Sequence, residues 1–243
     1  MRAWGAIVAR EMLVLRRRWA SLLSSYSLSP LLFMLVFGLG APIEKIDGMS
    51  YLVFLIPGLI ASSVMNNSFS LSSDINIARF YWQVFDAIRS APVSDLAYTL
   101  GEVVSGVIRG LLGAIVIVII AALFGVFLSI NGLLIVSIVF NAFVFASLAV
   151  ITSMLVKTHA QQAMLTNFVI TPMAFLCGTF FPIENYPAGI QTLIRLLPLT
   201  HASSTIRAAA LGQPFPYGSL VYLAAFGAVC FVGAVYTIRA SKE

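Results

Sequence analysis

Charged side chains are scarce in this sequence. Asp, Glu, Lys and Arg together make up 9% of the 243 residues, whereas 60% of the residues are hydrophobic and the mean hydropathy is +1.00. Soluble domains carry roughly 25% charged residues. The composition therefore excludes a soluble globular protein and predicts an integral membrane protein.

Cysteine is rare too, and motifs for nucleotide binding or catalysis are missing. Cys177 and Cys230 both fall in apolar runs, where a free thiol acts as a small apolar residue, so no disulfide is expected. No lysine follows a glycine, which excludes the phosphate-binding pattern G-x-x-x-x-G-K-[ST]. His159 and His201 are expected on opposite sides of the membrane, and neither belongs to a metal-ligand cluster or a nucleophilic triad. We expect no catalytic residue, no metal and no cofactor in this chain.

Five long runs contain no Asp, Glu, Lys or Arg. They cover residues 19–43, 48–73, 110–156, 160–183 and 208–238. A helix needs about 20 residues to cross the hydrocarbon, so each run crosses once, and the longest crosses twice with a turn at FLSING, 127–132. The sequence thus predicts an all-α membrane protein of six spans in a single domain, 1–243. The approximate spans are 20–41, 52–73, 101–128, 133–156, 162–180 and 217–238.

The basic residues are distributed unevenly around these spans. The formal charge is +5 and the pI about 9.5, values that would also suit a nucleic-acid-binding protein. Ten basic residues fall on one predicted side: Arg2, Arg10, Arg16, Arg17, Arg18, Arg79, Arg89, Lys157, Arg239 and Lys242. Lys45, Arg195 and Arg207 fall on the other side. The positive-inside rule therefore places both termini in the cytoplasm, and the basicity reflects topology rather than a nucleic-acid partner.

The first 18 residues have a helical apolar pattern. Apolar residues recur at spacings of three and four, with basic residues elsewhere around the helix: Trp4, Ile7, Val8, Met12 and Leu15. This pattern predicts an interfacial helix over 1–18, because the basic face suits lipid headgroups. The alternative is a cytoplasmic extension of the first span. The following apolar run is too long for a signal peptide, so a retained first span is expected.

A Pro-rich segment precedes the last predicted span. In residues 181–212, Pro187 opens a short helical pattern, Pro198 closes it, and a second pattern runs to Gly212 as the C-cap. Neither piece is long enough to cross the membrane. Ile190, Leu193, Ile194 and Leu197 still form an apolar stripe, which predicts two re-entrant helices in the outer leaflet.

The longest predicted cytoplasmic loop covers residues 74–101 and contains the polar stretch DAIRSAPVSD, 86–95. A helical apolar pattern runs through residues 77–88 until Pro92 ends it. Ser94 is expected to cap a new helix, with Asp95 in its first turn. The loop is therefore a helix, a break, and a helix that feeds the third span.

Several stretches of the chain resemble one known family. They are FLIPGLIASSVMNNSF at 54–69, the DAIRSAPVSD segment, VVSGVIRG at 103–110, and TPMAFLCGTFFPIENYPAGIQTLIRLLPLTH at 171–201. Together they resemble the permease subunit of type-2 ABC exporters over nearly the whole chain. The resemblance implies six spans, an amphipathic N-terminal helix, a cytoplasmic coupling helix between spans two and three, and two re-entrant helices before span six.

The same resemblance implies partners. It predicts a separate ABC ATPase subunit that binds ATP and Mg²⁺, a second permease copy in a homodimer, and a place in a bacterial or archaeal inner membrane. The contact with the ATPase is expected at residues 80–98. The residues expected to make it are Phe85 and Ile88 as apolar anchors, Asp86 and Arg89 beside them, and Pro92 with Ser94 at the bend. The alternative is an amphipathic helix resting on lipid.

Two sets of polar residues within the spans are further candidates. Glu102 and Arg109 fall on one face of the third span, where charge at membrane depth is often functional; the alternative is snorkelling to the interface. Asn66, Ser70 and Ser73 form a stripe in the second span, and Asn167 lies in the fifth. They are candidates for a substrate path or a dimer seam, although interhelical hydrogen bonding explains them equally well.

The function expected from these features is export of an amphipathic, lipid-linked, glycan or drug-like substrate, with ATP hydrolysed by the partner subunit. A secondary transporter or channel is the alternative, although it would usually need ionisable residues deep within its spans. An integral membrane enzyme is the remaining class, and the lack of converging titratable groups counts against it.

Overall fold

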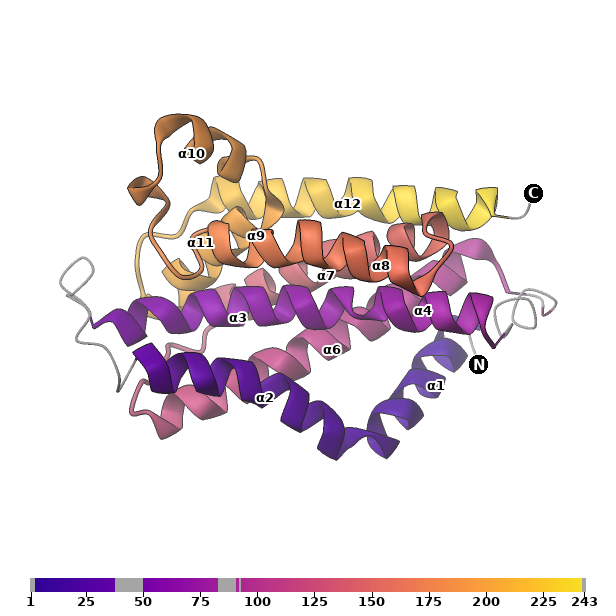
Figure 1. Cartoon of the computed structure of the whole chain (residues 1–243), viewed down its shortest axis with the longest axis horizontal. Coiled ribbons are helices and arrows are strands. Elements are labelled where there is room, and N and C mark those ends of the chain that lie inside the picture. Colours follow the sequence, from indigo (N-terminus) through magenta and orange to yellow (C-terminus); the bar gives the residue numbers. More distant parts are fainter. Residues whose placement is uncertain (1–2, 38–49, 83–90, 92, 242–243) are drawn as a thin grey trace.

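The computed structural model describes residues 3–37, 50–82, 91 and 93–241. These residues form helices and connecting turns, with no strand among them, so the predicted all-α class is confirmed for this part of the chain. The helices run alongside one another in a bundle (Figure 1). The beginning of α1 and the end of α12 lie at one end of this bundle, and α10 lies at the other.

Among the described residues, four helical segments are long and apolar enough to cross a membrane. They are α3 (Tyr51–Phe69) with α4 (Leu71–Phe80), α6 (Asp95–Leu123), α7 (Gly132–Leu155) and α12 (Tyr217–Ala240). α2 (Trp19–Leu35) is apolar but shorter. The predicted fifth span is divided into α8 (His159–Leu165), the π-helix η2 (Thr166–Ile170) and α9 (Thr171–Leu176).

α3 lies at the centre of the bundle and packs against α6, α7 and α11 (Pro198–Leu211). Most of its side chains are buried, including Leu55, Ile56 and Ile60. At Gly58 the neighbouring backbone approaches so closely that a Cβ atom would lie 2.1 Å from the carbonyl oxygen of Thr179. The core is therefore built around a helix whose packing requires a glycine at one point.

Local chemistry sets several helix ends where the sequence predicts them. Ser94 caps α6, because its Oγ accepts a hydrogen bond of 3.3 Å from the amide of Ala97. Asn131 ends the turn before α7 by accepting from the amide of Leu134 at 2.8 Å. Gly212 closes α11 in the left-handed conformation, with φ of 66°, which favours glycine.

The Pro-rich segment before α12 forms two short helices, as predicted. α10 (Ala188–Arg195) follows Pro187, and α11 begins at Pro198, where a missing amide hydrogen has no cost in the first turn. The expected apolar stripe of α10 is divided between two environments. Ile194 is buried, whereas the side chains of Ile190 and Leu193 are 43% and 66% exposed.

The second predicted span continues further than its apolar run suggests. After a turn at Ser70, the chain continues as α4 to Phe80. The side-chain amide of Asn76 donates to the carbonyl of Val156, and the guanidinium of Arg79 donates to the carbonyl of Met154, each at 2.8 Å. These donors meet carbonyl groups at the end of α7, which have no partner within that helix, and so hold α4 in place.

Candidate functional site

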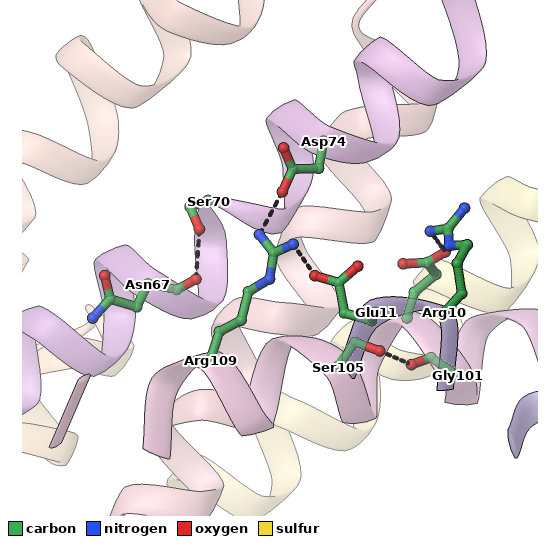
Figure 2. A network of polar contacts seen from close by, with 9 residues as sticks. Arg10, Glu11, Asn67, Ser70, Asp74, Gly101, Ser105 and Arg109 are labelled. Atoms are coloured by element: carbon green, nitrogen blue, oxygen red, sulfur yellow. Dashed lines mark hydrogen bonds and ion pairs between the residues drawn. The ribbon is translucent and has the colours of Figure 1, made fainter. Parts of the chain in front are cut away.

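A network of charged side chains joins α1 (Ala3–Arg17), α4 and α6. Arg109 of α6 lies between two carboxylates, those of Asp74 and Glu11 (Figure 2). Its Nη1 atom lies 2.5 Å from Oδ2 of Asp74, and its Nη2 atom donates to Oε1 of Glu11. Arg109 and Glu11 are 5% and 4% exposed, so this contact is shielded from solvent. One guanidinium therefore forms ion pairs with carboxylates from two other helices.

A second pair extends the network toward the start of α6. Glu102 is 1% exposed, and its Oε1 atom lies 3.5 Å from Nη2 of Arg10, on α1. Glu102 and Arg109 thus both face α1, although no ion pair joins them to each other within the described residues. α1 supplies a partner of opposite charge to each of the two charges that the sequence places on this face of α6.

Gly101 allows α1 to approach α6 closely. A Cβ atom at Gly101 would lie 2.8 Å from the Cβ atom of Ile7, so the two helices meet where α6 has no side chain. Ile7, Glu11 and Leu15 lie four residues apart on α1 and are all buried. Glu11 therefore points to the protein because it shares the apolar face of α1.

The turn at Ser70 directs α4 toward the same network. Ser70 donates a hydrogen bond of 2.7 Å to the carbonyl of Asn67, and Asp74 follows one turn later. The side chain of Asp74 is 49% exposed, so this carboxylate lies at the rim of the network. A pocket beside it reaches Arg17, Arg18 and Trp82.

The expected contact with an ATPase lies largely outside the described residues. Its members outside the described ranges are Phe85, Asp86, Ile88, Arg89 and Pro92. Of the predicted set, the structure describes Ser94, the cap of α6. Two of the three helices that carry the charged network flank this segment in the chain, α4 before it and α6 after it.

A separate cavity of about 210 Å³ lies between α2, α3 and α9. Most of its wall consists of hydroxyl, amide and aromatic side chains. The polar side chains that line it are Ser25, Tyr26, Ser29, Ser62, Ser63, Asn66, Asn67 and Thr171. Of the stripe that the sequence singles out, Asn66 lines this cavity, whereas Ser70 and Ser73 lie near the α3–α4 turn and Asn167 lies exposed on η2.

Sequence reasoning missed Glu11 and Asp74. Glu11 carries a signal in hindsight, since it lies four residues from both Ile7 and Leu15 on the apolar stripe of α1. The sequence gives no such signal for Asp74, because the apolar run of the second span ends at residue 73. A carboxylate just beyond that run is expected to be solvated. Within the described ranges, no group of three or more His, Cys, Asp or Glu side chains is arranged to hold a metal ion.

Comparison with known proteins finds similar membrane transport proteins. The family model for the ABC-2 type transporter matches residues 2–211. Nodulation protein J of Rhizobium meliloti (strain 1021) is 31% identical over 237 residues, which cover 96% of this chain and 88% of that protein. Nodulation protein J of Sinorhizobium fredii (strain NBRC 101917 / NGR234) is 35% identical over 190 residues, or 75% and 71% of the two chains. The inner membrane transport permease YadH of Escherichia coli (strain K12) is 28% identical over 236 residues, or 93% and 92%.

Proposed function

Because this chain belongs to the ABC-2 type transporter family, and is thus a membrane permease of an ABC transporter, we propose that it works as an exporter driven by a separate ATPase subunit. The substrate is amphipathic, lipid-linked, glycan or drug-like and leaves the cytoplasm. ATP and Mg²⁺ bind to the ATPase, and this chain supplies the path and the surface on which the ATPase acts.

The observation that carries this proposal is the ion-pair network beside residues 80–98. α4 ends at Phe80 and α6 begins at Asp95, and Arg109 joins α6 both to α4 and to α1. A displacement of the intervening segment would therefore move three helices together. Such a link suits a subunit driven from outside, because a motor acts only through contacts whose free energy differs between its nucleotide states.

The contact itself is proposed at Phe85 and Ile88, which insert into a groove on the ATPase, with Asp86 and Arg89 beside them. The end of α4 supports this choice. Tyr81 and Trp82, which follow α4 directly, have side chains that are 68% and 66% exposed. Aromatic residues are enriched in protein interfaces, as they are where spans meet the membrane surface.

Six crossings are proposed for the membrane domain, with both termini and the ATPase contact in the cytoplasm. α3–α4, α6, α7 and α12 supply four of them by length. α2 and the α8–η2–α9 segment supply the other two. The start of α1 and the end of α12 lie at the same end of the bundle, which supports an even number of crossings (Figure 1). YadH is named as an inner membrane permease, and we assign this chain to a bacterial or archaeal inner membrane.

The segment of α10 and α11 is proposed to dip into the outer leaflet as two re-entrant helices. It lies at the end of the bundle opposite the start of α1 (Figure 1). α11 is held within protein rather than lipid, since Ser203 donates to the carbonyl of Cys177 at 2.7 Å and Arg207 to that of Gly178 at 2.6 Å. Irregular backbone at membrane depth needs such partners.

A second copy of the chain is proposed to complete the transporter. The cavity of α2, α3 and α9 is the proposed substrate path, with Asn66 in its wall. Polar side chains on the outside of a membrane bundle are costly in lipid, so this face is better suited to a path or a dimer seam than to the bilayer.

Purification tests the proposal. A tagged chain extracted from the membranes of its source cells should retain a subunit that hydrolyses ATP in the presence of Mg²⁺, and the same extraction from cells with the untagged chain should not yield that activity. If the chain purifies with no ATPase and moves its substrate on an ion gradient alone, it is a secondary transporter.

A further inference from the structure

The groove between α2, α3 and α9 has two adjoining compartments of different character. The first is the polar cavity described above, and the second is an open apolar surface formed by one face of α2 and the two residues after it. Ser25, Ser29 and Phe33 line both compartments, so they adjoin along one face of α2. The other residues that line the second compartment are Leu28, Leu32, Val36 and Phe37.

Neither compartment is lined by a charged side chain among the described residues. In contrast, the pocket at α1 and α4 is lined by arginines and carboxylates. A charged ligand that left water for the α2–α3–α9 cavity would find no opposite charge there, which strongly disfavours it. The wall therefore selects for an uncharged polar group.

Three polar side chains in this wall, those of Tyr26, Ser29 and Asn66, have no hydrogen-bond partner within the described residues. Ser24 and Ser25 donate to carbonyl groups of their own helix, at 2.9 Å each. Ser29, one turn further along α2, makes no such bond, and neither does the amide of Asn66 across the cavity on α3. Ser29 and Asn66 are exposed, so both side chains are available to a ligand that carries hydrogen-bonding groups.

Aromatic residues form an apolar end of the cavity. The rings of Phe33 and Phe180 lie 4.8 Å apart between centroids, and those of Phe175 and Phe180 lie 5.1 Å apart and are stacked. Phe33 faces both compartments, so the aromatic cluster marks the boundary between the polar part of a ligand and its chain.

We infer that this two-compartment groove binds an uncharged amphipath, with a hydroxyl- or amide-bearing head against Ser29 and Asn66 and an alkyl chain along Leu28, Leu32 and Val36. The inference rests on the proposed export function and narrows its substrate class. It excludes amphipaths whose head carries a net charge. Glycan heads without acidic groups and neutral amides are both within the class.

Photolabelling with three matched probes tests this inference without the ATPase. Each probe has the same dodecyl chain with a diazirine, and the heads are glucose, sulfate and trimethylammonium. The tagged permease is placed in nanodiscs of zwitterionic lipid, and labelled peptides are identified by mass spectrometry. The glucoside should label peptides of α2, α3 and α9 in a saturable manner. It should compete about tenfold better than the charged probes, because each charged head would lose hydration with no opposite charge in the wall to replace it.

Substitutions in the cavity wall test whether Ser29 and Asn66 bind the head of the ligand. Ser29→Val with Asn66→Leu should reduce labelling by the glucoside about tenfold, whereas Ser24→Val, a serine outside the groove, should leave it unchanged. Asn66→Asp should shift the preference toward the trimethylammonium probe, a gain that unfolding cannot produce. Equal labelling by all three probes, or no labelling because a second copy fills the groove, would overturn the inference. Co-purification of an ATPase would stand in either case.

Discussion

Arg109 of α6 and Asp74 of α4 lie 2.5 Å apart between Nη1 and Oδ2, although 35 residues separate them in the chain. The segment between them includes the expected ATPase contact. Since Arg109 also binds Glu11, a single side chain fixes the relative positions of α1, α4 and α6. Removing it should affect the permease more than removing any one of its partners.

Glutamine substitutions test the order of importance within this network. Arg109→Gln leaves two carboxylates facing each other, whereas Glu11→Gln leaves Arg109 paired with Asp74. We expect Arg109→Gln to lower the free energy of unfolding by about 3–5 kcal/mol, because it breaks a buried pair, and Glu11→Gln to cost less. Thermal unfolding in detergent measures both.

Arg16→Gln is the matched control, because Arg16 lies exposed on the same helix as Glu11. Its effect should stay within about 0.5 kcal/mol. If Arg109→Gln were no more destabilising than Arg16→Gln, the network would not hold the three helices together.

Gly58→Ala tests the close approach of α3 to the backbone at Thr179. The added methyl group would lie 2.1 Å from a carbonyl oxygen, and backbone cannot rotate away as a side chain can. We expect a loss of about 1–3 kcal/mol, the usual cost of overpacking, measured by thermal unfolding. Gly218→Ala in α12 has open space around it and should not destabilise. Equal effects of the two substitutions would contradict the packing at Gly58.

Ser94→Ala tests whether the cap of α6 matters for coupling. The variant loses the acceptor for the amide of Ala97, which should cost about 1 kcal/mol, while Ser94→Asp keeps an acceptor and should remain close to wild type. ATP-driven transport should fall in the alanine variant and recover with aspartate. Retention of full transport by Ser94→Ala would remove Ser94 from the coupling set.

Features that depend on local chemistry were predictable from the sequence. Pro198, Gly212, Asn131 and Ser94 each act within a few residues of their own position, and each ends or begins a helix where expected. The apolar pattern predicts a helix over 77–88 but not that the second span continues directly into α4, because this continuation depends on donors to carbonyl groups of α7, which is remote in sequence.

The candidate site was predictable only in part, for the same reason. Glu102 and Arg109 stand out because charge is rare in an apolar run, but their partners come from α1 and α4. An interfacial helix over 1–18 would place its apolar stripe against lipid. Part of that stripe packs on α6 instead, since Ile7 meets Gly101, and so Glu11 is brought to Arg109.

Cysteine labelling tests the proposed topology. In a chain without its two native cysteines, a membrane-impermeant thiol reagent applied to sealed cells should not modify Arg89→Cys or Lys242→Cys. It should modify Gln213→Cys, an exposed position between α11 and α12 that is proposed to face outward. Modification of position 89 or 242 from outside would place the ATPase contact on the wrong side of the membrane.

The central claim is that an ATPase drives this permease through the segment between α4 and α6, and the variant Phe85→Asp with Ile88→Asp tests it most directly. A matched control is Phe127→Asp with Ile130→Asp, because these side chains are 83% and 69% exposed in the turn between α6 and α7, near the opposite end of α6. Both double variants should insert and purify in a folded state. ATPase that co-purifies with the tagged chain should be lost from the first variant and retained by the control. Full retention of ATPase binding and transport by the Phe85 and Ile88 variant would contradict the account.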